Sequence, residues 1–544
     1  MLRCVPVNVA HPMASQSDSV VYLRPETKIE PLVCRWYAWP YLIAPAQHAM
    51  NVAFRHVPLL QSFAANPAVH LAATQDPGLF GGPFVALEAQ DLEGAKALSG
   101  EMSRICERSL QFARDLKEFD RMLQDTARGS SLNPLYERLP ASLRGLVELS
   151  YDTNHHPQIR LREELVYEEG LASMAQEISL TMTADRQRAF FMSTPRIPSP
   201  RDLSIRMPFS DPRFDRLAAM RTTGIRFEEM VELLDLSGPA VDTFRGMVTT
   251  TRPQRNRPHY AGEGVRIRYF GHACVLIQSA RTSVLIDPLT AFEPGKDDRF
   301  TVADLPDLID VVVLTHSHQD HCVPEVLMQL RHRVGRVVVP RNNGGGLTDP
   351  SMKLILKALG FKNITVTDPF DELSLADCRV VSLPFSGEHA DLDICSKQAV
   401  FVEALGHGLM FLVDSDGADV ALYEKAARKL DRRVELLFLG MECQGAPLSW
   451  LYGPLLTRPV SRKDDESRRL SGADCERAWA AVQTLRPSQA FVYAMGQEPW
   501  LRYLMGLEYQ PDSVQLQESD RFLARCAQAG LLAERLHIRR ELNL

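Results

Sequence analysis

The chain has 544 residues, too many for a single hydrophobic core, and this length predicts two or three domains. Its 45% apolar and 24% charged residues are ordinary for a soluble globular protein, and a net charge of −7 with both signs intermixed argues against a nucleic-acid-binding face. The 10 cysteines include no C-x-x-C pair and the start of the chain has no signal-peptide core, so we expect reduced thiols in a cytoplasmic protein without a membrane span.

The first half of the chain interleaves strand-like and helical patterns. The first 20 or so residues are polar, and we expect them to be flexible. Residues 94–129 carry apolar side chains at spacings near three, four and seven, which predicts one long amphipathic helix that stops at Gly129. The alternating stretch 178–182 predicts a strand. Residues 1–250 are therefore expected to form an α/β domain, without a nucleotide-binding loop, a catalytic triad motif or a repeat.

Aromatic residues gather near the start of this domain. The strand-like stretch 20–45 crowds together Trp36, Tyr37, Trp39 and Tyr41. Such a cluster forms an interface or a ligand wall in some proteins, but aromatic runs more often pack into a core. The core interpretation is favoured.

Residues 251–264 are the best candidate for a linker, because they contain three Arg, two Pro and two Gly and no apolar periodicity. A basic stretch also holds phosphate in some proteins, but a solvated connector is favoured. Strands then alternate with helices over residues 265–510, which fits two mixed sheets packed between helices. Residues 511–544 read as a helical, amphipathic C-terminal segment.

A candidate metal site lies at the end of a strand in this second domain. Residues 311–314 are a run of apolar β-formers that predicts a buried strand. Four potential ligands follow within six residues: His316, His318, Asp320 and His321. Imidazole and carboxylate together suit zinc, iron and manganese, and the first two groups can face one ion while the last two face a second. The chain has only 15 histidines, so three in six positions argue against a solvated polar turn.

Two further strand-like stretches end at carboxylates. The hairpin-like stretch 266–288 ends in Asp287, and the buried stretch 410–417 is followed by Asp414, with Asp416 two residues later. Both are candidates to lie near the metal loop.

Two more histidines are candidates for the same region. His389 follows Glu388 after a strand, and neighbours at a strand end point in opposite directions, so only one of the two should face the metals. His272 lies in the opening hairpin, as either a pocket residue or a structural histidine.

The H-x-H-x-D-H pattern after an apolar strand resembles the signature of the metallo-β-lactamase-fold superfamily. The resemblance extends to the segment that ends in Asp287 and to the strand before Asp414, which matches the bridging carboxylate of the family and is favoured over Asp416. It implies a metallo-β-lactamase-fold αββα sandwich over residues 265–510. It also implies that Asp287 orients the metal loop and its imidazoles from behind, without touching an ion.

The chain departs from the hydrolytic members of this superfamily in two places. They carry a histidine in place of Glu388 and another after the last strand, whereas this chain has no histidine between His407 and His537. Gln497 or Glu498 stands where that final ligand would come. The site is then rich in carboxylate, and hard oxygen ligands stabilise Fe(III), which favours a di-iron pair over zinc.

A closer resemblance covers most of the chain. The N-terminal domain of about 250 residues, the phrase SGEH, the DSDG after the bridging strand and the ending YAMGQEPW together resemble the di-iron β-hydroxylase family of the chloramphenicol pathway, whose members are metallo-β-lactamase-fold oxygenases. Carried over residue by residue, the resemblance implies His316, His318 and Glu388 on one iron, Asp320 and His321 on the other, and Asp414 as the bridge. It selects Glu388 over His389, and it makes Glu388 and Asp414 the carboxylates expected at the catalytic centre.

The resemblance implies a monooxygenase of antibiotic biosynthesis. With two iron ions, O₂ and two electrons, it would hydroxylate the β-carbon of an amino acid held as a thioester on a carrier domain of a non-ribosomal peptide synthetase. The N-terminal domain, residues 1–250, would then serve docking to that peptidyl carrier domain and dimerisation. We therefore expect a cytoplasmic homodimer.

Two alternative functions remain open. A binuclear zinc hydrolase would use two zinc ions and a bridging hydroxide on a thioester, phosphodiester or lactone, and no electrons would move. The other is a carrier-binding module whose metal has only a structural role. The ligand set argues against it, because burying a carboxylate-rich pair of metal sites costs too much free energy for a site that only fixes a loop. The oxygenase is favoured because function has to be argued from the site.

Overall fold

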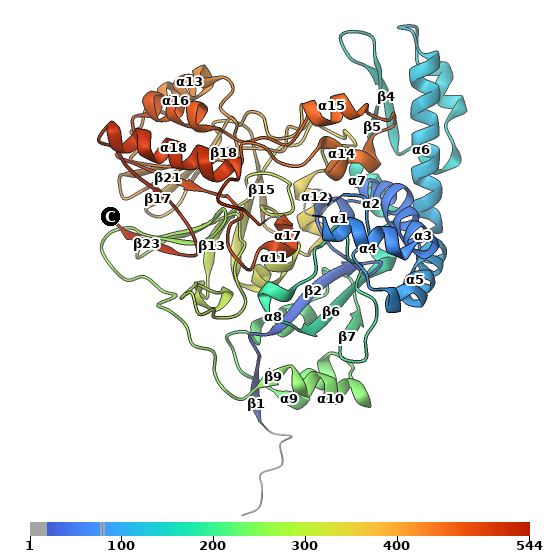
Figure 1. Ribbon diagram of the computed structural model, residues 1–544, viewed down its shortest axis with the longest axis horizontal. Coiled ribbons are helices and arrows are strands. Elements are labelled where there is room, and N and C mark those ends of the chain that lie inside the picture. The colour runs from blue at the N-terminus through green and yellow to red at the C-terminus, as the bar shows by residue number, and fades with distance from the viewer. Residues whose placement is uncertain (1–18, 77–78, 80–81, 507) are drawn as a thin grey trace, which may run out of the picture.

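The computed structural model describes residues 19–76, 79, 82–506 and 508–544 (Figure 1). The expectation for the first 20 or so residues falls on residues 1–18, which lie outside the described part. An N-terminal unit of helices and small sheets packs against a sandwich of two seven-stranded sheets. The predicted α/β N-terminal domain and αββα sandwich are confirmed. Within the described residues, none of the helices has the length and apolar character needed to cross a membrane.

The N-terminal unit is built around a four-stranded antiparallel sheet in the order β3-β2-β6-β7. Its strands are β2 (Thr27–Val33), β3 (Trp36–Tyr37), β6 (Gln176–Met182) and β7 (Leu203–Arg206). The smaller sheets hold β1 (Val20–Leu23), β8 (Ile225–Arg226) and β9 (Val248–Thr249), and β4 (Val147–Tyr151) with β5 (Pro157–Leu161). The helices are α1 (Pro40–Ile43), α2 (Pro45–Asn51), α3 (Val57–Ala65), α4 (Pro67–Gln75), α5 (Leu92–Ile105), α6 (Glu107–Thr126), α7 (Glu163–Glu168), α8 (Arg213–Ala219), α9 (Phe227–Leu233) and α10 (Pro239–Gly246). The strand predicted at 178–182 is confirmed within β6.

The single long helix expected over 94–129 is in fact two helices. α5 and α6 are separated by Cys106, whose φ of −98° and ψ of 20° interrupt the helical backbone. The apolar face continues across this break, since Met102 before it and Phe112 after it are both buried. Apolar periodicity alone therefore does not locate the break.

Two sheets form the sandwich of the second unit. The first has the order β15-β14-β13-β12-β11-β10-β23 and the second β16-β17-β18-β19-β20-β21-β22. The first consists of β10 (Arg266–Gly271), β11 (Cys274–Gln278), β12 (Ser283–Ile286), β13 (Ile309–Val313), β14 (Val334–Pro340), β15 (Ile364–Thr367) and β23 (Arg540–Asn543). The second consists of β16 (Glu372–Ser374), β17 (Cys378–Leu383), β18 (Ala399–Ala404), β19 (His407–Val413), β20 (Leu436–Gly440), β21 (Gln489–Tyr493) and β22 (Leu532–Arg535).

The helices of this unit are α11 (Pro324–Leu330), α12 (Met352–Ala358), α13 (Val420–Leu430), α14 (Leu448–Tyr452), α15 (Arg462–Ser467), α16 (Cys475–Leu485), α17 (Arg502–Met505) and α18 (Val514–Gln528). Residues 511–544, expected as a helical segment, contain α18 and also β22 and β23, which complete one edge of each sheet. The last residues of the described chain thus belong to the sandwich.

Alternating side chains of β13 show how the two units share their cores. Val311 and Val313 face the second sheet, where they join Phe411 and Phe438. Val312 points the other way, into a core that is continuous with the N-terminal unit. Both faces of this strand are buried, which explains why its sequence is an unbroken apolar run. The aromatic cluster at 36–41 lies in the same shared core, as favoured above, with all four rings at most 2% exposed.

The strand directions place one end of every key strand at the same edge of the sandwich. In the first sheet, β12 and β13 run parallel, and the turn between β10 and β11 lies beside the end of β12. In the second, β17 and β19 are both antiparallel to β18, and β20 and β21 continue parallel to β19. Segments far apart in sequence therefore meet at one edge, where sites in such sheets usually form.

A buried ion network joins the N-terminal unit to α11, the helix that follows the metal-loop sequence. The Arg188 guanidinium donates to Glu30 at 2.8 Å and to Glu325 at 2.6 Å. Tyr37 donates to the same Glu325 carboxylate at 2.7 Å. Burial opposes ionisation of Glu30, but Arg196 and Arg188 outweigh it and lower its pKa to about 2. The contribution of Glu30 to stability is therefore present at neutral pH and is lost as the pH falls through about 4 toward 2.

We expect Arg188→Ala to lower the free energy of unfolding by about 3–5 kcal/mol, because it leaves buried carboxylates without their cation. Urea denaturation followed by circular dichroism measures this change. Arg186→Ala is the matched control: Arg186 is 56% exposed and pairs with Asp297, so its loss should cost about 1 kcal/mol or less. Equal effects of the two substitutions would show that the buried network does not join the units.

Candidate metal centre

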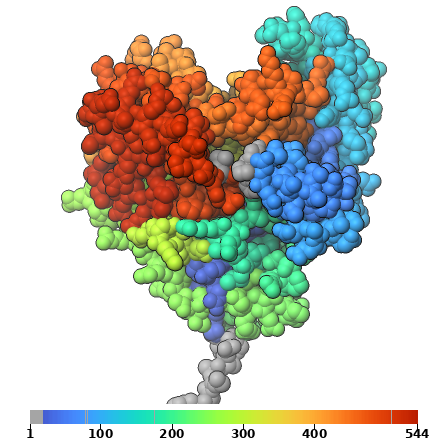
Figure 2. Space-filling view, viewed as in Figure 1, coloured from blue at the N-terminus to red at the C-terminus, as the bar shows by residue number. Residues whose placement is uncertain are grey.

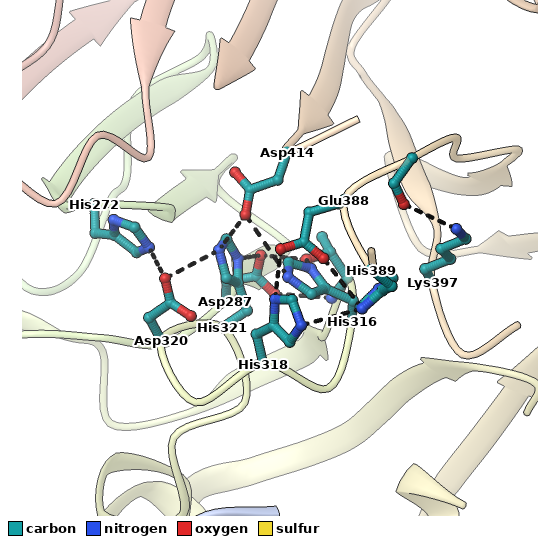
Figure 3. Close-up of polar contacts among 12 residues, drawn as sticks. His272, Asp287, His316, His318, Asp320, His321, Glu388, His389, Lys397 and Asp414 are labelled. Carbon is teal, nitrogen blue, oxygen red and sulfur yellow. Dashed lines mark hydrogen bonds and ion pairs between the residues drawn. The ribbon is translucent and has the colours of Figure 1, made fainter. Parts of the chain in front are cut away.

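The metal loop follows β13, and all four of its potential ligands are buried. His316 and His321 are fully buried, and His318 and Asp320 are 3% and 7% exposed. Figure 3 shows the four side chains converging with Glu388 and Asp414 from the second sheet. The structure thus brings together all six side chains expected to bind metal.

Asp287, at the end of β12, holds the loop from behind. Its Oδ1 accepts a hydrogen bond from the Thr315 backbone N–H at 2.8 Å, and its Oδ2 accepts from the Thr315 hydroxyl at 2.6 Å. His321 Nδ1 lies 2.8 Å from the same Oδ2, which leaves Nε2 directed into the cluster. Burial opposes a charge on His321, but Asp414, Asp320 and Asp287 outweigh it and raise its pKa.

Glu388 and His318 form the second contact of the cluster. His318 Nδ1 lies 2.7 Å from Glu388 Oε1, and its Nε2 lies 2.7 Å from the hydroxyl of Tyr452 in α14. Glu388 has a left-handed φ of 70°, and Lys397 Nζ donates to the carbonyl of Gly387 at 3.0 Å. The lysine thereby holds the turn that carries this carboxylate.

Asp414 lies between the two halves of the cluster. Its Oδ2 is 2.9 Å from His321 Nε2 and 3.7 Å from His316 Nε2. Asp416 lies outside: its Oδ1 accepts from the Ser386 hydroxyl at 3.1 Å and from the Ala418 backbone N–H at 3.0 Å. The geometry favours Asp414, as the family resemblance implied.

His272 belongs to the cluster. The sequence alone left open whether it is a pocket residue or a structural histidine. Its Nε2 lies 3.0 Å from Asp320 Oδ2, and its ring centroid lies 5.0 Å from that of His321. The turn between β10 and β11 carries His272 to the shared edge. The order of the strands could have predicted the position of His272, because the turn between β10 and β11 and the end of β12 lie at the same end of the first sheet.

Glu498 lies apart from the three groups of donor atoms. The Glu498 carboxylate accepts a hydrogen bond from the Tyr269 hydroxyl, and among the described residues Glu498 joins none of the three metal-sized groups of His, Asp and Glu. His272 offers the additional imidazole instead.

His389 does not point away from Glu388 as the strand rule suggested. Its Nδ1 lies 3.0 Å from the Tyr452 hydroxyl and 3.1 Å from both His318 Nε2 and Glu388 Oε2. The rule fails because the backbone there is a turn with positive φ, not an extended strand.

The donor atoms fit two adjacent metal ions. Three overlapping groups have ligand atoms within 4.8 Å of one another: His316 with His318 and Glu388, His316 with His321 and Asp414, and His272 with Asp320 and His321. Several of these atoms are buried without a hydrogen bond of normal geometry to any described residue: His316 Nε2, His321 Nε2, Glu388 Oε2 and Asp414 Oδ1. Buried polar atoms of this kind are costly unless an ion satisfies them, so the residues present suit a pair of metals.

Comparisons with known proteins agree with this site. A sequence model described as the diiron non-heme beta-hydroxylase N-terminal domain matches residues 22–253, and one for the beta-lactamase superfamily domain matches residues 266–438. The chain is 34% identical, over 96% of its length and 99% of the relative's, to the 4-amino-L-phenylalanyl-[CmlP-peptidyl-carrier-protein] 3-hydroxylase of Streptomyces venezuelae.

Solved structures give the same result for the fold. The crystal structure of CmlA, a diiron beta-hydroxylase from Streptomyces venezuelae, has a TM-score of 0.90 at 33% identity and covers 97% of this chain and 100% of its own. A structure of a point variant of the CmlA beta-hydroxylase has a TM-score of 0.87 at 33% identity, over 96% of this chain and 100% of its own. Both units of the chain and their arrangement therefore have a counterpart of known structure.

We expect His272→Ala to reduce bound metal from about two ions per chain to about one, because the Asp320 side of the centre loses an imidazole. Elemental analysis after desalting measures the stoichiometry. The control is His407→Ala, which removes a histidine that pairs with Glu435 at 2.8 Å away from the cluster. Two tightly held ions in His272→Ala would exclude His272 as a ligand.

Tyr452→Phe should weaken metal binding about 10- to 100-fold while leaving the fold intact, because the lost hydroxyl orients His318 from behind. Competition against a coloured chelator gives the affinity. Tyr151→Phe, which removes a hydroxyl bonded to the Ser130 carbonyl in the N-terminal unit, should not change it. An unaltered affinity in Tyr452→Phe would show that His318 needs no such support.

Proposed function

Because this chain belongs to the family of diiron non-heme β-hydroxylases, we propose that it hydroxylates the β-carbon of an amino acid tethered to a peptidyl carrier domain of a non-ribosomal peptide synthetase. The observation that carries the proposal is the cluster of buried, unsatisfied imidazole and carboxylate atoms at the edge of the sandwich. The proposed substrate class follows the relative, whose name gives an aminoacyl carrier protein as its substrate.

The proposed metal set follows the three groups of donor atoms. His316, His318 and Glu388 would hold one iron, and Asp320 and His321 with His272 the other. Asp414 would bridge them from the second sheet. The bound iron pair would supply the activation of O₂ with two electrons from an external donor.

The chain's own residues contribute orientation and exclusion of water. Asp287 holds His321 with Nε2 inward, and Tyr452 holds His318, so that the imidazoles are positioned before a metal binds. Burial and the neighbouring His321 and His318 lower the pKa of His316. The buried loop and the Tyr41 ring packed edge-on against Tyr452 at 5.9 Å exclude bulk water from this side of the centre.

The proposal assigns the N-terminal unit to docking of the carrier domain and to dimerisation, in a cytoplasmic homodimer. The hydrophobic core of this unit is continuous with that of the first sheet, so a partner bound to the unit would lie on residues that pack against the strand before the metal loop. The zinc hydrolase alternative is set aside. A carboxylate, Glu388, stands where hydrolytic members carry a histidine, and the relative that matches nearly the whole chain is a hydroxylase.

The test uses protein expressed in iron-supplemented medium, together with an aminoacyl carrier domain, a reductant and O₂. Intact-mass spectrometry of the carrier should show a gain of one oxygen atom that disappears without O₂ or without reductant. Two irons per chain should accompany this activity. Turnover that needs neither O₂ nor electrons, with two zinc ions per chain, would overturn the proposal in favour of hydrolysis.

Glu388→His is expected to lower hydroxylation about 100-fold or more and to raise the zinc retained on purification, because it replaces a hard oxygen ligand with an imidazole. Zinc and iron contents are measured together with product formation. The exposed Glu424→His serves as the control and should change neither. An active, iron-replete Glu388→His enzyme would contradict the role given to this carboxylate.

A further inference from the structure

Two thiols far apart in sequence meet in the N-terminal unit. Cys34 lies in the turn between β2 and β3, and Cys106 separates α5 from α6, 72 residues later. Their Sγ atoms are 3.1 Å apart, a hydrogen-bonding distance, and the two residues are 8% and 2% exposed. Neither residue is used by the metal centre.

The backbone holds Cys34 in an unusual conformation. Cys34 and Arg35 have left-handed φ values of 49° and 65°, and Val33 pairs with Trp36 across this two-residue turn. Such turns favour Asn and Gly, so a cysteine and an arginine here carry a conformational cost. The Arg35 side chain offsets it by donating to Glu177 at 3.2 Å and to the Ser204 hydroxyl at 2.7 Å. The turn is thereby fixed with its thiol against Cys106.

The surroundings favour a thiolate on one member of the pair. The hydrogen bond from Cys34 lowers the pKa of Cys106, and the nearby His48 imidazole of α2 lowers it further, against the effect of burial. The His48 nitrogens are buried and form no hydrogen bond of normal geometry with another described residue. A thiolate beside a thiol is the arrangement in which cysteines react with oxidants.

A cavity opens beside Cys34. It has a volume of about 350 Å³ and is lined by Cys34, Arg35, Met102 and Ile105 among others. Ion pairs at its wall, Arg35 with Glu177 and Arg206 with Glu101, make it polar and open to water. A molecule the size of hydrogen peroxide can reach Cys34 through it, and the Cys106 sulfur lies 3.1 Å behind that of Cys34.

We propose that Cys34 and Cys106 form an oxidisable dithiol that a hydroperoxide converts into a disulfide. One sulfur takes one oxygen from hydrogen peroxide as a sulfenic acid and releases water. The second thiol loses its proton and displaces the hydroxyl as water, which forms the S–S bond. Two thiols and one hydrogen peroxide thus give one disulfide and two water molecules, and a small-molecule thiol reductant reverses the change.

The disulfide would link the turn between β2 and β3 covalently to the junction of α5 and α6. β3 leads directly from this turn to Trp39 and Tyr41, which stack at 5.0 Å, and Tyr41 packs against Tyr452 beside His318. The disulfide would therefore fix the turn that comes directly before the segment that covers the metal centre. The inference stands on the N-terminal unit alone and does not depend on the proposed function.

The test treats the full-length protein with a small excess of hydrogen peroxide and then alkylates the remaining thiols. Mass spectrometry of the non-reduced digest should show a Cys34–Cys106 cross-link and a loss of two hydrogen atoms. The melting temperature should rise by about 5 °C and should return to its starting value with dithiothreitol. Absence of this cross-link, while other cysteines are oxidised, would overturn the inference.

Two variants separate the pair from general oxidation. Cys34→Ser should stop the reaction at a sulfenic acid on Cys106, trapped by dimedone. Cys395→Ser removes the thiol that is exposed at the surface and should leave the Cys34–Cys106 cross-link unchanged. Failure to trap a sulfenic acid on Cys106 in Cys34→Ser, or loss of the cross-link in Cys395→Ser, would each contradict the mechanism.

Discussion

Burial of carboxylates and imidazoles at the edge of an apolar sandwich is the constraint on which the rest of this structure depends. Such groups are costly to bury unless each has a partner. The chain meets this need by pairing Asp287 with His321, Glu388 with His318 and Asp320 with His272. The atoms left over point into the cluster, as the close-up view shows, where they would hold the proposed pair of ions (Figure 3).

The N-terminal unit completes this burial. It covers the outer face of the first sheet, and Arg188 and Tyr37 hold α11 just after the metal loop. On the other side, Arg55 donates to the Trp450 carbonyl, and the blue N-terminal helices adjoin the orange segment with α14 in the space-filling view (Figure 2). The two units therefore act as one body around the centre, which agrees with relatives that match both of them.

Backbone strain gathers where the strands deliver their side chains. His272, Asp287 and Glu388 have φ values of 50°, 40° and 70°, and Val413, just before Asp414, has 55°. Residues other than glycine adopt this conformation at a cost of about 1–2 kcal/mol each. Dense packing and the hydrogen bonds of Asp287 and Lys397 maintain it. The strain turns each side chain from the strand direction toward the shared edge.

The sequence by itself determined the alternation of strands and helices and the four donors of the metal loop, because both are local patterns, whereas the sandwich, Glu388 and Asp414 were implied by the family resemblance. Runs of apolar β-formers and the spacing from His316 to His321 are visible within a few residues. Only the tertiary structure placed His272 beside Asp320, 48 residues away, and Tyr452 beside His318, 134 residues away. It also paired Glu498 with Tyr269 and turned His389 toward His318. These contacts depend on strand order and on left-handed turns, which a one-dimensional pattern does not encode.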